Sequence, residues 1–536
     1  MVTSLSRPSW RADVLSGFLV FLIALPLCLG ISLASGFPPV AGLLTAIIGG
    51  VVVSLFMGAP LTIKGPAAGL IVIALGAVTD LGQGDATVGY RRALACIAIA
   101  GVLQAGLGLA RAGSLADFFP SSVVHGMLAA IGIIICARQV HTMLGVTPQG
   151  HEPLALLAEI PASMMAMNPE VVFIGVLSLA ILYGLPRIPH PVAKRVPAPM
   201  VVLAVAVPLA LFFDFEHGHT YSLAVTHTTY QVAPRFLVTL PDSLLGSIAF
   251  PDWSQVGSLA SIRYVAMFTL VGSIESLLSA RAIDQLDTRR LKSDYDRDLL
   301  AVGIGNTLAG LVGGLPMIAE IVRSKANLDA GARSRWSNFS HGVFLLVFVA
   351  FFPDLIHRIP LAALAAMLVY TGTRLAAPSE FIRTWHVGRE QLFIFCATAV
   401  GCVAVDLLVG VAIGILAKFV ISLAIGAQPR SLFKVAVESS RQGEAALLTV
   451  VSSATFSNYL SLKARIYREI AAGPVWLDVS RAPLVDHTTM ERLHDLAAEL
   501  GHEGKELKIM GADELRKLSA HPMAARRSEF PPPPSG

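Results

Sequence analysis

Three charged side chains lie within apolar sequence, where charge is rare. Glu275 interrupts an apolar run from about 264 to 280, and Glu320 and Arg323 follow a Gly-Gly-Leu-Pro stretch at 313–316. A charged side chain at the centre of a bilayer costs about 3 kcal/mol or more, so such residues usually pair with one another and mark ion or substrate pathways. This set of residue types indicates a site for a small anion and a coupling cation.

The elements that must position these side chains are two interrupted helices. Gly and Pro at 313–316 end one helix before another restarts, and a similar break occurs at 60–69. Broken backbone is tolerated at membrane depth only where it lines a cavity or is buried in protein. A restarted helix directs its N-terminal NH groups and a partial positive charge into that space, which favours an anion. The sequence therefore predicts a secondary transporter for a small anion.

The composition places the chain in a lipid bilayer. Of 536 residues, 54% are hydrophobic and only 14% charged, and the mean hydropathy is +0.68. Soluble domains carry about 25% charged residues. Apolar runs of about 20 residues, each long enough to span a bilayer, recur from Val14 to Ala424. This composition predicts a polytopic membrane protein and excludes an ordinary soluble enzyme.

The apolar runs predict fourteen segments, of which the third and tenth are short and broken by Gly or Pro. The first span is expected at 13–34, the second ends near residue 57 and the third near residue 78. The others are expected near 92–110, 120–140, 171–186, 196–213, 261–280, 298–313, 316–328, 338–352, 360–375, 390–405 and 407–426. If the chain consists of two halves of seven, the two broken segments occupy corresponding positions. That spacing is typical of an inverted-repeat transporter.

The distribution of Lys and Arg predicts the orientation. Basic residues gather in loops on one side of the predicted topology, at 187–195, 281–297, 325–335, 374–383 and 430–434. The side richer in Lys and Arg is usually cytoplasmic. We therefore expect a multi-pass protein of the inner (plasma) membrane with both termini in the cytoplasm, although Arg91 and Arg92 fall on the opposite side.

A change of composition near residue 428 predicts a second domain. Strands are expected at 445–451, 475–479 and 507–510, and helices at 457–469 and 488–500. Alternating strands and helices indicate a small α/β domain. We predict a transporter domain at 1–427, this cytoplasmic domain at 428–519, and a disordered Pro-rich tail at 520–536.

In the order and spacing of its short motifs, the chain resembles the SulP/SLC26 family of anion transporters. The matching pieces are Asp13–Gly17 with Ala24–Pro26, Gly65–Ala68, Glu275–Arg281, Gly303–Asn306, Gly313–Pro316, Arg323–Ser324, Asn327 with Gly331–Arg333, and Ile359–Pro360. The C-terminal domain resembles a STAS domain, with Asp486-His487-Thr488 as its Asp-x-Ser/Thr element. The resemblance implies a helical membrane protein of seven plus seven inverted segments with two half-helices. It also implies core and gate domains, homodimers, and elevator-like alternating access.

On this resemblance, Glu275 is expected to bind a coupling ion, Na⁺ or H⁺, and Ser279 one turn later to share it. The alternatives are a salt bridge between Glu275 and Arg323, and a Ser279 hydroxyl bonded back to its own helix. Ala67 and Ala68 are expected to present backbone NH groups to the anion. The alternative for these small residues is tight helix packing.

The corresponding positions on the tenth segment are Ala319, Glu320 and Ile321, followed by Arg323 near the anion. Many relatives carry small or hydroxyl residues where this chain has Glu320, so Glu320 is a candidate proton carrier or an ion-pair partner of Arg323. On the first segment, Leu27 stands where many relatives carry glutamine, and Ile31 is expected to be a wall residue of the site.

The leading interpretation is uptake of sulfate, or alternatively bicarbonate, driven by a proton or sodium gradient. A sodium-coupled bicarbonate symporter, an uncoupled channel or exchanger, and a STAS-based scaffold remain alternatives, and a related nucleobase transporter is disfavoured by the STAS-like domain. Thr488 is a candidate phosphorylation site. We expect no catalytic residues, no cofactor beyond the coupling ion, no bound metal centre and no nucleic-acid partner.

Overall fold

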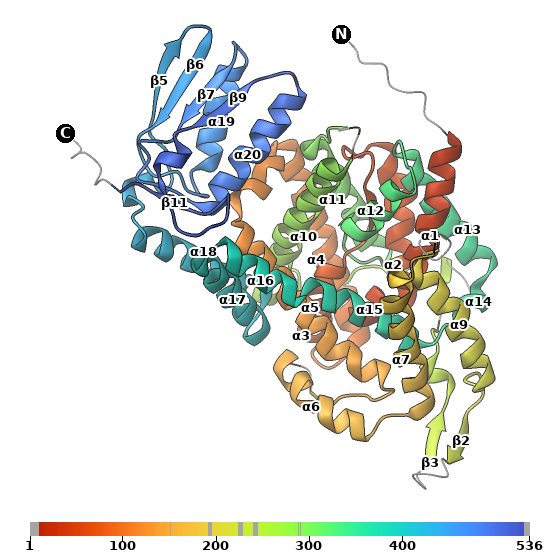
Figure 1. The fold of residues 1–536 in the computed structure, drawn as a ribbon. Helices are drawn as coiled ribbons and strands as arrows, with labels where there is room; N and C mark the ends of the chain where they lie inside the picture. The colour runs from red at the N-terminus through yellow and green to blue at the C-terminus, as the bar shows by residue number, and fades with distance from the viewer. Residues whose placement is uncertain are drawn as a thin grey trace. The chain divides into compact units, whose positions relative to one another are not determined.

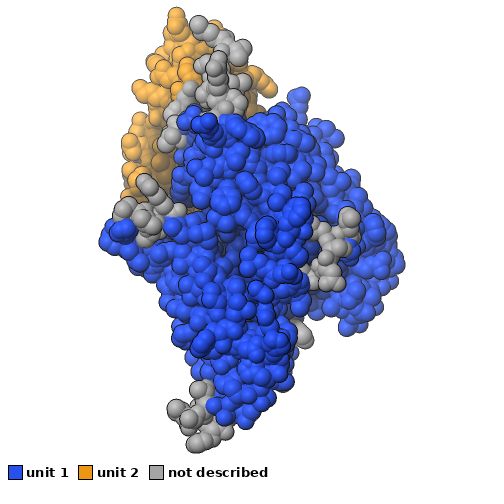
Figure 2. Space-filling model, turned by 90° about the vertical axis from the view of Figure 1, so that its right-hand side faces the viewer, with its two compact units in different colours: residues 1–113, 131–375 blue, residues 114–130, 376–536 orange. Residues whose placement is uncertain are grey.

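The computed structural model describes residues 10–150, 152–190, 196–222, 229–239, 245–287, 289 and 291–529. The chain forms two compact units, residues 1–113 with 131–375 and residues 114–130 with 376–536 (Figure 2). The first unit holds most of the helical segments, and the second holds the last helices and the C-terminal sheet (Figure 1).

Helices account for nearly all of the first unit. Its α-helices are α1 (Trp10–Ala34), α2 (Pro39–Ile47), α3 (Ile71–Gly82), α4 (Ala86–Leu109), the end of α5 (Ser121–Met143), α6 (Pro153–Met165), α7 (Pro169–Gly184), α9 (Ala198–Phe212), α10 (Leu259–Leu286), α11 (Tyr295–Val312), α12 (Ile321–Asp329), α13 (Trp336–Phe351), α14 (Pro353–His357) and α15 (Leu361–Leu375). Within the described residues, seven helices of the whole chain are long and apolar enough to cross a membrane, and five shorter apolar ones accompany them. The predicted multi-pass character is thus matched by the lengths of these helices.

The two predicted breaks lie in the third and tenth segments. Gly313 adopts φ +99°, a left-handed conformation that ends α11, as glycine commonly does at a helix C-terminus. The chain then runs through strand β4 (Met317–Glu320) before α12 begins. In the third segment, strand β1 (Ile63–Pro66) and the short 3₁₀ helix η3 (Ala68–Leu70) precede α3. Both helices therefore begin only after an extended stretch.

Two features of the first unit bear on the sequence-based predictions: an additional helix, and the contacts of Arg91 and Arg92. α6 was not predicted, because its 13 residues are too few for a span. Of the two arginines that fall on the opposite side in the predicted topology, Arg92 lies 3.4 Å from Asp252 and donates to the carbonyl of Leu81, and Arg91 donates to the carbonyl of Phe250.

The second unit contains α16 (Pro378–Val387), α17 (Arg389–Ala404), α18 (Leu407–Ala424) and a sheet of order β5-β6-β7-β9. The strands are β5 (Val437–Gln442), β6 (Ala445–Val450), β7 (Val475–Asp478) and β9 (Leu507–Met510), with β5 antiparallel to β6 and the other pairs parallel. Helices α19 (Tyr459–Ile470) and α20 (His487–His502) provide the crossovers and pack against the strands in one apolar core. The three predicted strands and two predicted helices of this domain are present.

The domain extends beyond its predicted end. Strand β11 (Arg526–Arg527) pairs with β8 (Leu484–Val485) and β10 (Arg516–Lys517), so residues 520–529 belong to the domain and not to a tail. Strand β11 could not be predicted from the sequence, because it has only two residues and both are charged. The four prolines predicted to be disordered lie outside the described residues. The edge strand β5 was also missed, because its polar sequence Val-Glu-Ser-Ser-Arg-Gln lacks an apolar face.

Candidate functional site

The two half-helices are joined by a two-stranded antiparallel ladder. β1 and β4 pair Ile63 with Glu320 and Pro66 with Met317, and the NH of Ala67 donates to the carbonyl of Pro316 at 3.2 Å. Each strand is followed by a helix, so the N-terminal ends of two helices lie at this ladder. Such ends carry partial positive charge and suit an anion.

Polar side chains from neighbouring helices satisfy the backbone around the breaks. The amide of Asn306 in α11 bonds both the NH and the carbonyl of Met317. Ser276 in α10 accepts from the NH of Ala319 at 3.0 Å, and Ser324 accepts from the NH of Ile63 at 2.8 Å. These bonds account for groups that would otherwise be unpaired at membrane depth. They also explain the amide and hydroxyl residues within otherwise apolar helices.

Glu320 occupies the N-terminal end of the other half-helix. Its Oε1 accepts a hydrogen bond from the backbone NH of Ala68 at 3.1 Å, and Nη2 of Arg323 lies 3.7 Å from the same oxygen. Only 8% of Glu320 is exposed. The contact joins residues 252 positions apart, on the two segments that the β1–β4 ladder pairs. A carboxylate of the protein itself therefore sits where an NH group and a guanidinium would otherwise meet an anion.

Arg323 is fully buried and reaches across to the third segment. It donates from Nη2 to the carbonyl of Pro66 at 2.8 Å and from Nη1 to the thiol of Cys28 at 3.4 Å. Its Nε has no hydrogen-bond partner among the described residues. A Cβ at Gly65 would overlap the guanidinium, so a larger residue there would displace Arg323. Of the two acids considered as ion-pair partners of Arg323, the one beside its guanidinium is Glu320.

Glu275 also approaches the third segment, at Gly69, which follows the Ala68 that Glu320 contacts. A Cβ at Gly69 would overlap its carboxylate, so the acid lies directly against the backbone of η3. Its Oε2 is buried and has no hydrogen-bond partner in the described part of the chain. The two acids therefore flank successive residues, Ala68 and Gly69, at the start of one half-helix. A buried carboxylate oxygen without a donor is suited to a cation or a proton.

Comparison with known proteins identifies this architecture. A model of the sulfate permease family matches residues 10–398. The chain belongs to the sulfate permease family. Its relatives include the putative sulfate transporter YvdB of Bacillus subtilis, 28% identical over 414 residues (77% of this chain and 73% of YvdB). The bicarbonate transporter BicA of Picosynechococcus is 25% identical over 416 residues, covering 77% of this chain and 70% of BicA.

Solved structures support the same fold for this sulfate permease family member. The transmembrane domain of a cyanobacterial bicarbonate transporter BicA aligns with a TM-score of 0.63 at 24% identity, over 76% of this chain and 97% of that domain. The predicted SulP/SLC26 family and the predicted transporter fold with two half-helices are confirmed. The family and these relatives are transporters and not enzymes.

Several residues predicted for the site of this family member lie at the ladder. Ala67, Ala68, Glu320 and Arg323 converge there, and Ala319 is fully buried with its NH bonded to Ser276. Ser279 is buried one turn after Glu275 on α10.

The remaining predicted residues lie elsewhere or at the margin. Ile321 is 43% exposed at the start of α12, and Ile31 is almost fully buried on α1. Leu27 packs against an apolar cluster of α7, α9 and α15 residues, and the neighbouring Cys28 is the α1 side chain that meets Arg323. Thr488 is fully buried at the start of α20.

Three residues at the ladder were not predicted as site residues. They are Cys28, Ser276 and Asn306, all within apolar helices. Asn306 carried a signal, since an amide in a predicted span needs partners. Cys28 and Ser276 carried none, because a small residue in a helix is compatible with packing alone.

Proposed function

We propose that this protein is a secondary active transporter of a small inorganic oxyanion, and that Glu320 carries a coupled proton. Alternating access would be elevator-like, as expected for the fold. The single observation that supports the proposal is the hydrogen bond from the Ala68 NH to the Glu320 carboxylate, beside Arg323.

In this proposal, Glu320 and the substrate anion compete for one positively charged site. An ionised Glu320 neutralises Arg323 and occupies the Ala68 NH, so a substrate anion meets both a filled donor and a like charge. Protonation of Glu320 removes that charge, and an oxyanion can then accept from Ala68 and Arg323 in its place. Arg–oxyanion hydrogen bonds are among the stronger ones in proteins. Anion and proton therefore bind together, and both leave on the other side of the membrane.

Sulfate is the first candidate substrate and bicarbonate the second. The site consists of backbone NH groups and one guanidinium, which suit a compact oxyanion. The relatives named for sulfate and for bicarbonate support both choices.

A second candidate is sodium coupling at Glu275. The buried Oε2 of Glu275 has no donor among the described residues, and Ser279 follows one turn later. A sodium ion there would neutralise Glu275 beside the half-helix and favour a monovalent anion such as bicarbonate.

We further propose that residues 428–529 form a STAS-like regulatory domain in the cytoplasm, that the chain resides in the plasma membrane with both termini inside, and that it forms homodimers. The hydroxyl of Ser121, at the start of α5, donates to Glu491 of the C-terminal domain at 2.5 Å. The fifth segment therefore begins on the side of that domain, which agrees with the proposed orientation.

The test is uptake of labelled sulfate and bicarbonate into proteoliposomes, with proton and sodium gradients imposed separately. We expect proton-driven accumulation in the parent protein. In Glu320→Gln, accumulation should be lost while anion exchange at equilibrium persists, because the neutral amide still admits the anion. Glu216→Gln, a change at an exposed acid paired with Arg358, should behave as the parent.

Other outcomes discriminate among the candidates. Sodium-driven bicarbonate uptake that is lost in Glu275→Gln and retained in Glu320→Gln would replace the proton mechanism with the second candidate. Flux down the anion gradient without accumulation under either cation gradient would indicate a channel or exchanger.

A further inference from the structure

A basic cavity lies in the first unit, and no residue of the half-helix ladder lines it. It has a volume of about 490 Å³ and is lined by Arg138, Thr142, Gly145, Val146, Thr147, Pro148, Gly150, Arg235, Phe236 and Leu361. None of these residues belongs to the site described above. The lining carries two positive charges and no acidic side chain. Its electrostatic character is therefore that of an anion pocket.

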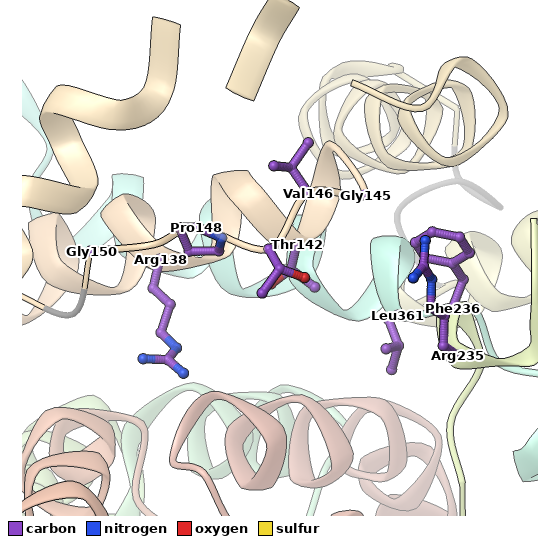
Figure 3. Close-up of a pocket in the computed structure, with 10 residues that line it drawn as sticks. Arg138, Thr142, Gly145, Val146, Pro148, Gly150, Arg235, Phe236 and Leu361 are labelled. Atoms are coloured by element: carbon purple, nitrogen blue, oxygen red, sulfur yellow. The ribbon is translucent and has the colours of Figure 1, made fainter. Parts of the chain in front are cut away.

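Arg138 is the decisive residue of this pocket. It lies near the end of the membrane-spanning helix α5, is partly buried, and makes no ion pair or side-chain hydrogen bond with a described residue. Charged residues within membrane segments normally pair with a protein group or face an aqueous cavity. In Figure 3 the side chain of Arg138 extends away from its own helix, among the residues that line the pocket. Its five N–H donors are thus available to a ligand.

Thr142 lies one turn after Arg138 on the same face of α5, since residues four apart in a helix are neighbours. Its side chain lines the cavity, and no hydrogen bond to the hydroxyl is found within the described residues. A guanidinium and a hydroxyl at this spacing can hold two oxygens of one oxyanion.

Arg235 adds positive charge at the other end of the pocket, where its guanidinium lies 5.0 Å from the centroid of the Phe236 ring (Figure 3). Glu159 of α6 contacts the loop that borders the pocket, and its carboxylate accepts from the NH groups of Gln149 and Gly150. That acid is therefore committed to the loop and does not neutralise Arg138.

We propose that Arg138 and Thr142 form a second oxyanion site, separate from the half-helix site, and that Arg235 raises the local anion concentration. Under the proposed orientation α5 runs outward, so the site lies towards the outer face. The ligand is an oxyanion of sulfur, carbon or phosphorus. It comes either from solution or from the headgroup of an anionic phospholipid.

The test is chemical modification of arginine by phenylglyoxal, mapped by mass spectrometry on the full chain in detergent. Sulfate, compared with chloride at equal ionic strength, should slow modification of Arg138 about tenfold, a factor equivalent to ~1.4 kcal/mol of binding free energy. Arg235 should be slowed less. Arg358, an exposed arginine outside the pocket that pairs with Glu216 at 3.0 Å, is the internal control and should not change.

Two variants keep the test independent of transport. Thr142→Val should reduce the protection of Arg138 without altering its modification rate in chloride. Arg138→Gln should abolish the protection of Arg235 if both residues serve one pocket. Equal slowing of Arg138, Arg235 and Arg358, or no slowing of Arg138 by any oxyanion, would overturn the proposal.

A parallel experiment in nanodiscs separates the two sources. Protection by sulfate in detergent, unaffected by lipid charge, identifies a solution anion. Protection that requires an anionic phospholipid and is not reproduced by sulfate identifies a headgroup as the ligand of the same site.

Discussion

Lys418 and Asp486 form an ion pair in which both side chains are almost fully buried. Nζ of Lys418, in α18, lies 3.4 Å from Oδ2 of Asp486, which caps the N-terminus of α20 by accepting from the NH of Thr489. The same carboxylate accepts from the NH of Phe456. One acid thus holds the last long apolar helix, the cap of α20 and the segment before α19 together.

Removing one partner of this pair should destabilise the C-terminal domain strongly. Lys418→Gln leaves Asp486 buried without its counter-charge, which costs about 3–5 kcal/mol for such pairs. Pulse proteolysis of the full chain across a urea series measures the effect. Lys505→Gln, which removes an exposed pair with Glu503, should change stability by no more than about 1 kcal/mol; equal effects of both variants would refute the role of the buried pair.

The same pair predicts a loss of stability in acid. Burial opposes ionisation of Asp486, but the charge of Lys418 and the NH donors of Thr489 and Phe456 hold the pKa of Asp486 below its ordinary value. A depressed pKa means that the stabilisation is fully present above the unfolded pKa of about 3.9 and is lost as the pH falls through the folded pKa. Proteolytic sensitivity should therefore rise below about pH 4. In Asp486→Asn this part of the pH dependence should disappear.

Thr488 is fully buried, and its hydroxyl has no hydrogen-bond partner among the described residues. Thr488→Val should therefore be neutral or slightly stabilising, since no bond is lost. Thr488→Glu should destabilise the domain, because a carboxylate would be buried without a partner. Urea stability of the two variants checks both statements. A stable Thr488→Glu protein would mean that the site accepts charge, as a phosphorylation site must.

Gly69 tests the position of Glu275. A methyl group at Gly69 would overlap the Glu275 carboxylate, so Gly69→Ala should reduce anion uptake at least tenfold, equivalent to ~1.4 kcal/mol, while the protein still inserts and folds. The matched control is Gly106→Ala in α4, where an added Cβ meets open space. Uptake by both variants is compared at equal protein content, and normal uptake by Gly69→Ala would place Glu275 away from the transport step.

Lys64 and Asp298 form a second buried pair, with Nζ 2.6 Å from Oδ2 and both side chains almost inaccessible. Lys64→Met should cost about 3–5 kcal/mol. The double variant Lys64→Met, Asp298→Leu should recover part of that loss because no unpaired charge remains, although Asp298 also accepts from the NH of Ala59. Thermal unfolding of the four proteins of this cycle in detergent gives the coupling between the two residues. Additive losses would show that the two charges act independently.

The limits of sequence reasoning can be traced to particular residues. The breaks at 60–69 and 313–316 were predictable because Gly and Pro act locally on the backbone. The contact between Glu320 and Ala68 was not, because it depends on the register of β1 against β4 across more than 250 residues. Lys64 and Asp298 carried a partial signal, a lysine and an aspartate bordering apolar runs, but only the fold identifies them as partners. The polar edge strand β5 and the two-residue strand β11 have no pattern that distinguishes them from loops.

The β1–β4 ladder has an electrical consequence. Backbone pairing fixes the two half-helices to one another. In the proposed elevator-like movement, Arg323 would therefore cross the membrane field together with the group that neutralises its charge. In the proposed mechanism the empty site moves with ionised Glu320 beside Arg323, and the loaded site moves with neutral Glu320 and the anion. For a monovalent anion the moving charge is the same in both directions, so transport is electroneutral. For a divalent anion the loaded movement carries one additional negative charge, and an inside-negative potential opposes inward transport by about 2.3 kcal/mol per 100 mV.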